Sequence, residues 1–189
     1  DGCVESNYGT YIFDRSWPWC INELKNDKDS RRVTLPINQP FHKLLNEKDI
    51  PCTQYLHFFI RDDELIMSAH MRSNDVIFGF CNDCYTFGLF HQLMYNELLP
   101  HYPDLRLGSY IHNADSLHLY SRHYSKADKI TKDDISGLPI KRIELKRHVT
   151  YTYIKENEFF LPTKDISKKK LIKFIDKMSD KLLVHSEEV

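Results

Sequence analysis

Apolar positions along the chain recur with two periods, which together predict a mixture of helices and strands. Helical spacing marks residues 17–25, 83–99 and 167–184. The second segment predicts the clearest helix, because its apolar residues form one stripe and Pro100 follows it. The stripe consists of Phe87, Phe90, Leu93, Met94 and Leu98.

Strand-like patterns account for most of the remaining chain. They cover residues 31–37, 55–60, 64–71, 105–112 and 117–121, and two further strands are expected within residues 140–154. The acidic run Arg61-Asp62-Asp63 predicts a tight turn, and therefore a hairpin, between the second and third strands. Residues 38–50, with Pro40 and mixed charges, are expected to form a loop. These elements predict an α+β domain with a mixed sheet and flanking helices.

Length and composition narrow the possible partners. A chain of 189 residues suits a single domain, residues 1–189, with one core. Its net charge of -1 gives no basic surface of the kind that binds nucleic acids, so no such partner is expected. We find no apolar run long enough to cross a membrane and no signal peptide, and five cysteines fit a reducing compartment. A cytoplasmic protein without a membrane partner is expected.

The hairpin brings a cysteine and an arginine together. Cys52 precedes the first strand and Arg72 follows the second, so a two-stranded ribbon places both at one end. A nearby fixed cation favours the thiolate form of a cysteine, which attacks electron-poor carbon. Arg72 is therefore expected both to bind an anionic substrate and to activate Cys52. The alternative is a small, buried, apolar role for the cysteine.

Cys81 and Cys84 form a Cys-x-x-Cys motif. A structural zinc site needs about four ligands, usually from a second such pair, and the other three cysteines do not supply one. A redox motif would need a different setting. No metal site is expected; Cys81 is predicted to line a pocket and Cys84 to face the helix.

Five short motifs, in order over roughly the first two thirds of the chain, resemble the thymidylate synthase superfamily. Within it they are most similar to the deoxycytidylate hydroxymethylases of bacteriophages. The motifs are Ser6-Asn7-Tyr8-Gly9, Asp29-Ser30-Arg31-Arg32, Pro51-Cys52-Thr53, the block from Arg72 to Asp83, and Leu117-His118-Leu119-Tyr120-Ser121-Arg122-His123. The resemblance implies a thymidylate synthase-like fold, two subunits joined sheet to sheet in a homodimer, and action in the host cell cytoplasm if the protein is viral.

The resemblance also implies a reaction. Cys52 would add to carbon 6 of deoxycytidylate (dCMP), so that carbon 5 attacks the one-carbon unit of 5,10-methylenetetrahydrofolate and water completes a hydroxymethyl group. Arg72 and Ser73 would bind the 5'-phosphate, because guanidinium groups and hydroxyls match phosphate oxygens. Arg31 and Arg32 would reach into the site of the other subunit. From the sequence alone, a solvated pair of arginines remains the alternative.

Further positions take roles by the same resemblance. His118 and Tyr120, two apart on an expected strand and so on one face, would bind the sugar hydroxyl. Structural roles are their alternative. Asp75 and Gly79 would contact the folate, although Asp75 could equally cap the following helix.

Asp83 stands where thymidylate synthases place an asparagine and the hydroxymethylases an aspartate, so it is expected to be the catalytic residue that reads the base. Cytosine presents a bare ring nitrogen and an amino group, whereas uracil presents a ring N–H and a carbonyl. A carboxyl group with one shared proton pairs with cytosine. Mispairing buried polar groups costs about 1 to 3 kcal/mol, or roughly ten- to a hundredfold or more in selectivity. The adjacent Asn82 leaves a one-residue shift, and a thymidylate synthase acting on deoxyuridylate (dUMP), as the alternative.

Two regions depart from the family. The chain starts at Asp1, where family members already have an N-terminal portion with a water-organising glutamate. Either a fragment or a natively shortened fold is expected, and a non-catalytic nucleotide-binding module is a third hypothesis. Residues 164–189 predict a divergent, lysine-rich helix with a solvated face, or alternatively one that binds a partner or an anion. The sequence does not distinguish deoxyribonucleotides from ribonucleotides.

Overall fold

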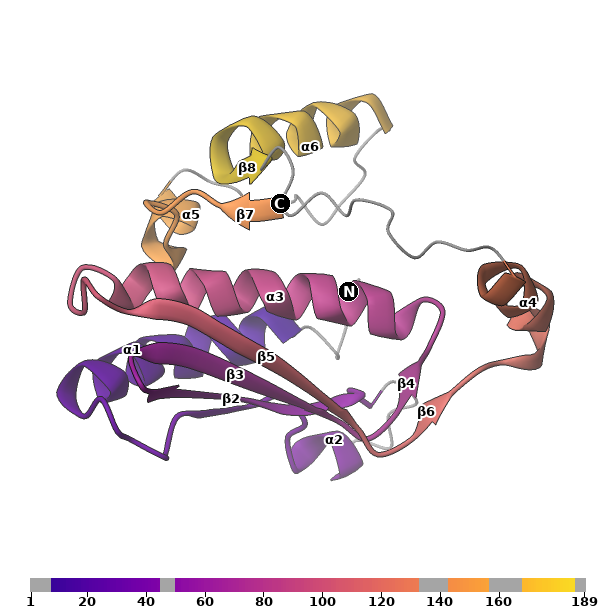
Figure 1. Ribbon diagram of the computed structural model, residues 1–189, viewed down its shortest axis with the longest axis horizontal. Coiled ribbons are helices and arrows are strands. Elements are labelled where there is room, and N and C mark those ends of the chain that lie inside the picture. Colours follow the sequence, from indigo (N-terminus) through magenta and orange to yellow (C-terminus); the bar gives the residue numbers. More distant parts are fainter. Residues whose placement is uncertain (1–7, 45–49, 133–142, 157–167, 186–189) are drawn as a thin grey trace.

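A computed structural model of the chain describes residues 8–44, 50–132, 143–156 and 168–185. Its main sheet has the strand order β1-β2-β3-β5 (Figure 1). The strands are β1 (Thr34–Pro36), β2 (Thr53–Arg61), β3 (Glu64–Met71) and β5 (Arg106–Ala114). The first three are antiparallel, whereas β5 runs parallel to β3. The mixed sheet that the sequence predicted is confirmed.

The predicted hairpin is present as β2 and β3. Arg61 pairs with Glu64, and the two turn residues Asp62 and Asp63 have φ angles of 51° and 59°. Two-residue hairpin turns favour positive φ at both positions, and Asp tolerates it better than most residues. Strand alternation then buries one face of the sheet, with Leu56, Phe58, Ile60, Leu65, Met67 and Ala69 in the core.

Helices cover the buried face of the sheet. A π-helical segment, η1 (Thr10–Ser16), leads into α1 (Trp17–Asn26), and α3 (Gly79–Leu98) lies along the strands (Figure 1). The predicted stripe of α3 faces the core: Phe90 packs against it, and Phe87, Leu93, Met94 and Leu98 are buried. The helix begins four residues earlier than expected. Asp75 accepts from the N–H groups of Ile77 and Phe78, immediately before this start.

The opposite face of the sheet is less covered. Tyr55, His57 and Phe59 on β2 are half-buried, and the rings of Tyr55 and His70 stack 4.7 Å apart. Ile111 on β5 is 41% exposed on the same side of the strands. This face therefore carries aromatic and imidazole side chains rather than the charged residues of a fully solvated sheet.

Several short elements differ from the sequence prediction. The expected loop at residues 38–50 contains α2 (Phe41–Leu44), although residues 45–49 lie outside the described ranges. The strand expected at residues 31–37 is limited to β1, and the one expected at 117–121 to β6 (Leu117–His118). β6 pairs in parallel with β4 (Asn74–Asp75) and is followed by η2 (Ser121–His123) and α4 (Tyr124–Lys132), which the sequence did not predict.

The second strand expected within residues 140–154 is absent from the described part of that range, which begins at residue 143. β7 (Ile143–Leu145) is a strand, but α5 (Tyr151–Glu156) is a helix. Side chains of α3 bind the backbone between them: Asn96 donates to the carbonyls of Lys146 and Val149, and Glu97 accepts from the N–H of Tyr151. These bonds replace those of a sheet ladder, so the segment turns and coils.

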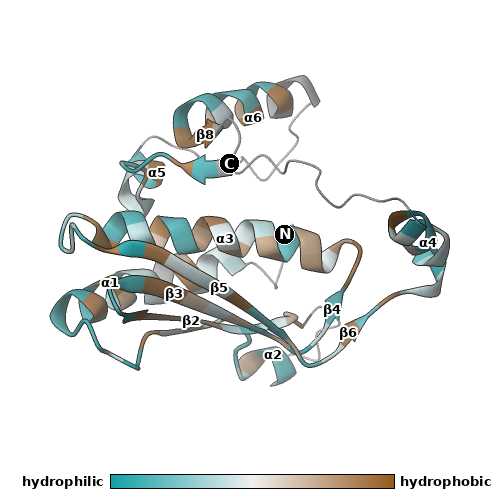
Figure 2. Cartoon of the chain, viewed as in Figure 1, coloured by the Kyte–Doolittle hydropathy of each residue, from teal (hydrophilic) through white to brown (hydrophobic). Residues whose placement is uncertain are grey.

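The C-terminal helix is confirmed as α6 (Lys168–Leu182), but its expected last residues form β8 (Leu183–His185), antiparallel to β7. Polar and apolar residues alternate around α6 (Figure 2). Leu182 is buried and Met178 packs on the core, whereas Ile172 and Ile175 are 48% and 53% exposed. Within the described ranges, no helix combines the length and the apolar character needed to cross a membrane.

Candidate active site

Three strand ends meet at one rung of the sheet. Met71, the last residue of β3, pairs with Thr53 at the start of β2 and with Ala114 at the end of β5. Cys52 and Arg72 flank this rung, and the N–H of Arg72 donates to the carbonyl of Cys52 at 2.9 Å. The proximity that the hairpin predicted is therefore present in the backbone.

The Cys52 segment is held from two sides. Cys52 is a half-buried free cysteine, and its N–H and that of Thr53 donate to the Tyr8 hydroxyl at 3.2 and 3.3 Å. The Arg72 guanidinium donates from Nη2 to the carbonyl of Ile50 at 2.8 Å and from Nε to that of Pro51 at 3.2 Å. A guanidinium has five N–H groups, so donors remain for an anion after these two bonds. The arginine thus fixes the loop before Cys52 and still presents positive charge to solvent.

Asp75 lies at the start of α3. Its carboxylate accepts from the N–H groups of Ile77 and Phe78 at 3.2 and 3.3 Å. Burial raises its pKa, but these N–H groups and the nearby His123 outweigh burial and hold the pKa below its usual value. Both N–H groups precede the first residue of α3, Gly79, and the N-cap residue Phe78 has no side-chain cap bond, so the capping role and the folate contact both stay predictions.

The pairing of β4 with β6 brings His118 to this site. Asp75 lies opposite His118, whose carbonyl accepts from the N–H of Val76 at 2.9 Å. Tyr120 follows the strand rather than belonging to it, yet its ring meets that of His118 edge to face, with centroids 4.8 Å apart. The guanidinium of Arg122 lies over the ring of Tyr120, 4.3 Å from its centroid. The two expected sugar-binding residues are neighbours, but a ring contact holds them together and not a shared strand.

Asp83 belongs to a group of polar side chains that the sequence did not connect. Its Oδ2 accepts from Nδ2 of Asn74 at 2.9 Å, and the same nitrogen lies 3.3 Å from Nε2 of His112. Nδ1 of His112 lies 2.5 Å from the hydroxyl of Tyr110. We call Asn74, Asp83, Tyr110 and His112 the Asp83 cluster.

Burial sets the charge of the Asp83 cluster. It raises the pKa of Asp83, against the opposing effects of the Asn74 hydrogen bond and the His112 charge. It also lowers the pKa of His112 and raises that of Tyr110, so neutral forms are favoured at all three sites. In its protonated form, a carboxyl group is able to donate a hydrogen bond as well as accept one.

The sequence contains only weak signals for the members of the Asp83 cluster that were not predicted. Asn74 stands inside the Arg72 to Asp75 motif, and strand alternation points it away from its neighbours Ser73 and Asp75. Tyr110 and His112 are two apart in a predicted strand, so one face carries both. Residues 74 and 112 are far apart in the sequence, and the parallel pairing of β3 with β5 brings them together in space. No local sequence pattern indicates this pairing.

Three other predicted site residues lie near Arg72 or Asp83. Asn82 is exposed, in contrast to the half-buried Asp83, and Ser73 is half-buried next to Arg72. A Cβ on Gly79 would stand 3.0 Å from Oδ1 of Asn74, so glycine allows that side chain to approach α3. The contact of Gly79 with folate stays a prediction.

The Cys-x-x-Cys residues do not form a metal site within the described part of the chain, where no three His, Cys, Asp or Glu side chains are grouped for one. Cys81 is exposed. Cys84 belongs to α3, and its sulfur lies 4.0 Å from Nδ1 of His112, so it also reaches β5. Burial raises the pKa of the Cys84 thiol.

Arg31 and Arg32 lie far from Cys52 within one copy of the chain. The carbonyl of the next residue, Val33, accepts from the N–H of Phe58. Phe58 lies six positions along the chain from Cys52, which at the usual strand rise separates the two residues by about 20 Å. Arg32 is paired with Glu23, with Nη2 and Oε1 2.6 Å apart. Within one copy of the chain, these arginines are not brought to Cys52.

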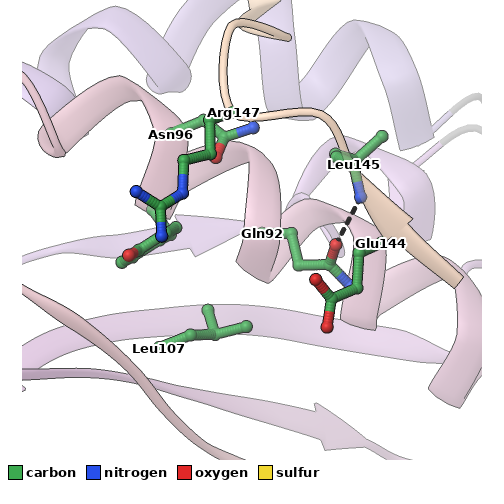
Figure 3. A pocket seen from close by; sticks show the side chains of 7 residues that line it. Gln92, Asn96, Leu107, Glu144, Leu145 and Arg147 are labelled. Atoms are coloured by element: carbon green, nitrogen blue, oxygen red, sulfur yellow. Dashed lines mark hydrogen bonds between the residues drawn. The ribbon is translucent and has the colours of Figure 1, made fainter. Parts of the chain in front are cut away.

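Two cavities lie away from the strand ends. A polar one of about 160 Å³ is lined by Gln92, Asn96, Glu144 and Arg147, and Gln92 accepts from the N–H of Leu145 at 2.7 Å (Figure 3). Its lining residues on α3 start nine positions beyond Asp83, or about 14 Å along the helix. An apolar cavity of about 340 Å³ lies between α3 and the C-terminal elements. None of the predicted site residues lines either cavity.

Comparison with known proteins assigns the family. The sequence profile described as Thymidylate synthase matches residues 14–170. The chain belongs to the thymidylate synthase family. The resemblance that the motifs carried is confirmed.

Relatives and a solved structure agree with this family. The deoxycytidylate 5-hydroxymethyltransferases of Enterobacteria phages T6 and T2 are 34% identical over 137 and 157 residues, which cover 67% and 72% of this chain and 56% and 63% of theirs. Thymidylate synthase of Fusobacterium nucleatum is 26% identical, over 75% of this chain and 52% of its own. Thermostable thymidylate synthase A of Bacillus subtilis superposes with a TM-score of 0.59 at 20% identity, covering 70% of this chain and 45% of that one, and this confirms the α+β fold. The chain thus spans less than two thirds of each relative's length.

Proposed function

We propose that this protein transfers a one-carbon unit from 5,10-methylenetetrahydrofolate to carbon 5 of a pyrimidine nucleoside monophosphate, and that its substrate is dCMP. The observation that carries the choice of base is the half-buried Asp83, which accepts a hydrogen bond from Asn74 and whose pKa burial raises. Family membership and the names of the phage relatives support the reaction class.

Cys52 is the proposed nucleophile. Its thiolate adds to carbon 6 of the pyrimidine, and the displaced electron pair makes carbon 5 nucleophilic. Arg72 and Ser73 hold the 5'-phosphate, since the guanidinium already lies beside the Cys52 segment and keeps unused N–H donors. His118 and Tyr120 hold the sugar, next to the β4 strand that follows Ser73.

The start of α3 fits a flat aromatic cofactor with N–H donors. Phe78 and Phe80, on either side of the first helical residue, are 49% and 39% exposed, and the backbone N–H of Phe78 donates to the carboxylate of Asp75. Exposed apolar side chains and a hydrogen-bond acceptor therefore belong to the same short segment. The folate supplies an electrophilic one-carbon unit when bound. Asp75 and Gly79 would position it, and water completes the hydroxymethyl group.

Asp83 selects the base. With one proton, its carboxyl group accepts from the cytosine amino group and donates to the bare ring nitrogen. A carboxyl group held in that arrangement meets the uracil carbonyl with an acceptor and the uracil N–H with a donor. The position next to it, Asn82, is exposed and makes no such bond to Asn74, which argues against the one-residue shift.

A homodimer completes the phosphate site in this proposal. Arg31 and Arg32 lie about 20 Å along the sheet from Cys52 of their own chain, so they can serve a site only in another copy. The half-buried aromatic face of the sheet, with Tyr55, His57 and Phe59, offers the contact surface. Mixing Cys52→Ala with Arg32→Ala chains should restore about a quarter of the sites if sites are shared. No restoration after subunit exchange would exclude sharing.

The reaction is tested by incubating the protein with dCMP or dUMP and labelled methylenetetrahydrofolate. We expect hydroxymethylated dCMP together with tetrahydrofolate. Methylated dUMP with dihydrofolate would instead identify a thymidylate synthase. Nucleotide binding without any turnover, even at high protein concentration, would select the non-catalytic module and overturn the proposal.

A further inference from the structure

Asn74 is the most enclosed polar residue of the Asp83 cluster. Its side chain is 3% exposed, and its amide nitrogen lies between Oδ2 of Asp83 and Nε2 of His112. Among the residues that the structure describes, its Oδ1 has no hydrogen-bond partner. A buried polar atom without a partner is costly, so its retention beside titratable groups points to a role other than stability.

The two contacts of Asn74 fix the roles of its neighbours. An amide group has two N–H donors, and here both face acceptors. His112 must then accept at Nε2 and carry its proton on Nδ1, which faces the hydroxyl of Tyr110. Oδ2 of Asp83 is likewise fixed as an acceptor. A proton on Asp83 is therefore directed to the other oxygen, Oδ1.

This asymmetry matters because a carboxylic acid with two equivalent oxygens pairs with either base. Moving its proton from one oxygen to the other reverses the order of donor and acceptor. In one order the group pairs with the amino group and bare ring nitrogen of cytosine. In the reversed order it pairs with the carbonyl and ring N–H of uracil. Aspartate alone therefore does not ensure a preference for cytosine.

We infer that Asn74 is a specificity-determining positioning residue, which holds Oδ2 of Asp83 as the acceptor for the cytosine amino group and leaves Oδ1 to donate a proton to the ring nitrogen. The inference rests on the proposed function. Gly79 supports the arrangement, because a Cβ there would stand 3.0 Å from Oδ1 of Asn74.

Two substitutions of Asn74 separate positioning from packing. Asn74→Ala removes the donor, so the dCMP to dUMP ratio of kcat/KM should fall by about tenfold or more, mainly through a relative gain for dUMP. Asn74→Asp keeps the shape but replaces the donor by a second carboxyl group. At high pH the two carboxylates repel. As pH falls and both carboxyl groups become protonated, Asp at this position can donate to Oδ2, so the preference for dCMP should recover in this variant and not in Asn74→Ala.

Other titratable groups surround Asn74 and Asp83. They are His112 and Tyr110 from β5, which belong to the cluster, and Cys84 from α3, with Cys81 near Cys84. They are common to the wild type and to both variants, so the pH recovery is measured as the difference between Asn74→Asp and Asn74→Ala.

Asn96 provides a matched control. It is also 3% exposed, and its amide donates to two backbone carbonyls, 13 positions beyond Asp83 on α3. Asn96→Ala and Asn96→Asp should lower the melting temperature but keep the nucleotide preference within about twofold of the wild type.

Each result decides a separate question. Folded Asn74 variants that keep the wild-type ratio at every pH would overturn the inference while the proposed function stands. If Asn74→Ala does not fold, the isosteric Asn74→Asp is compared with the wild type at each pH instead. A wild-type protein that turns over neither nucleotide would overturn the proposed function, and this inference with it.

Discussion

The two ends of α3 each hold a buried asparagine, and the two are used differently. Asn96, near the C-terminal end, donates to the carbonyls of Lys146 and Val149 and fixes a turn. Asn74, packed against the N-terminal end, donates to Asp83 and His112 and leaves its own oxygen unpaired. Equal burial therefore does not mean equal function. A buried amide whose donors reach backbone carbonyls stabilises the fold, whereas we propose that one joining titratable side chains positions them for chemistry.

The largest loss of activity near the N-terminal end of α3 is expected from substitution of Cys52. Cys52→Ala should lower kcat by at least about a thousandfold, because it removes the proposed nucleophile, whose carbonyl accepts from the N–H of Arg72. Nucleotide affinity, measured by calorimetry, should change little. The control is Cys20→Ala in α1, a core cysteine whose thiol pKa burial raises to about 12. Equal loss of turnover in both variants would contradict the assignment.

His91, between the two ends of α3, tests whether the helix contributes to stability independently of the site. It is buried, and its Nε2–H donates to the carbonyl of Leu65 at 2.7 Å. Burial lowers its pKa to about 4, against 6.5 in its ordinary state, although the Leu65 bond opposes this shift. The unfolded chain therefore binds more protons between these values, so stability is present above pH 6.5 and is lost as pH falls toward 4.

The size of this loss follows from the shift. The free energy of unfolding should fall by about 3 kcal/mol over that range, measured by urea unfolding at several pH values. His91→Gln, which keeps a donor for the Leu65 carbonyl, should lack this acid-sensitive part. An identical pH dependence in both proteins would assign the sensitivity to other groups.

A smaller effect is expected from Arg72→Lys. An ammonium group cannot bind two carbonyls and an anion in the planar arrangement of a guanidinium, so dCMP affinity should fall by about tenfold. Arg106→Lys is the matched control, because Arg106 pairs with Glu64 at the opposite end of β3. Titration calorimetry with dCMP measures both. A similar loss for the two variants would remove Arg72 from the phosphate site.

Local patterns predicted those parts of the fold that local forces decide. The β2–β3 hairpin followed from alternation and an acidic turn, and the apolar stripe of α3 from helical spacing. Asp83 was reached through a motif. The pairing of β4 with β6 was not predicted, since two-residue strands are too short to show an alternating pattern.

The remaining errors arose where distant residues override local preference. Residues 151–156 have a strand-like composition, yet α5 forms there: Glu97 of α3 accepts from the N–H of Tyr151, and Asn96 donates to the carbonyl of Val149 just before it. The contact between Asn74 and His112 depends on which edge of β3 receives β5. A single sequence carries no signal for that choice, so the Asp83 cluster could be seen only after folding.

The central claim, that Asp83 reads a cytosine ring, is tested most directly by competition between equal amounts of dCMP and dUMP, with methylenetetrahydrofolate present. Wild-type protein should form hydroxymethylated dCMP, and Asp83→Asn should move the product ratio toward dUMP by roughly ten- to a hundredfold. Asn82→Ala should leave the ratio unchanged. A ratio that is the same for wild type and Asp83→Asn would contradict the account.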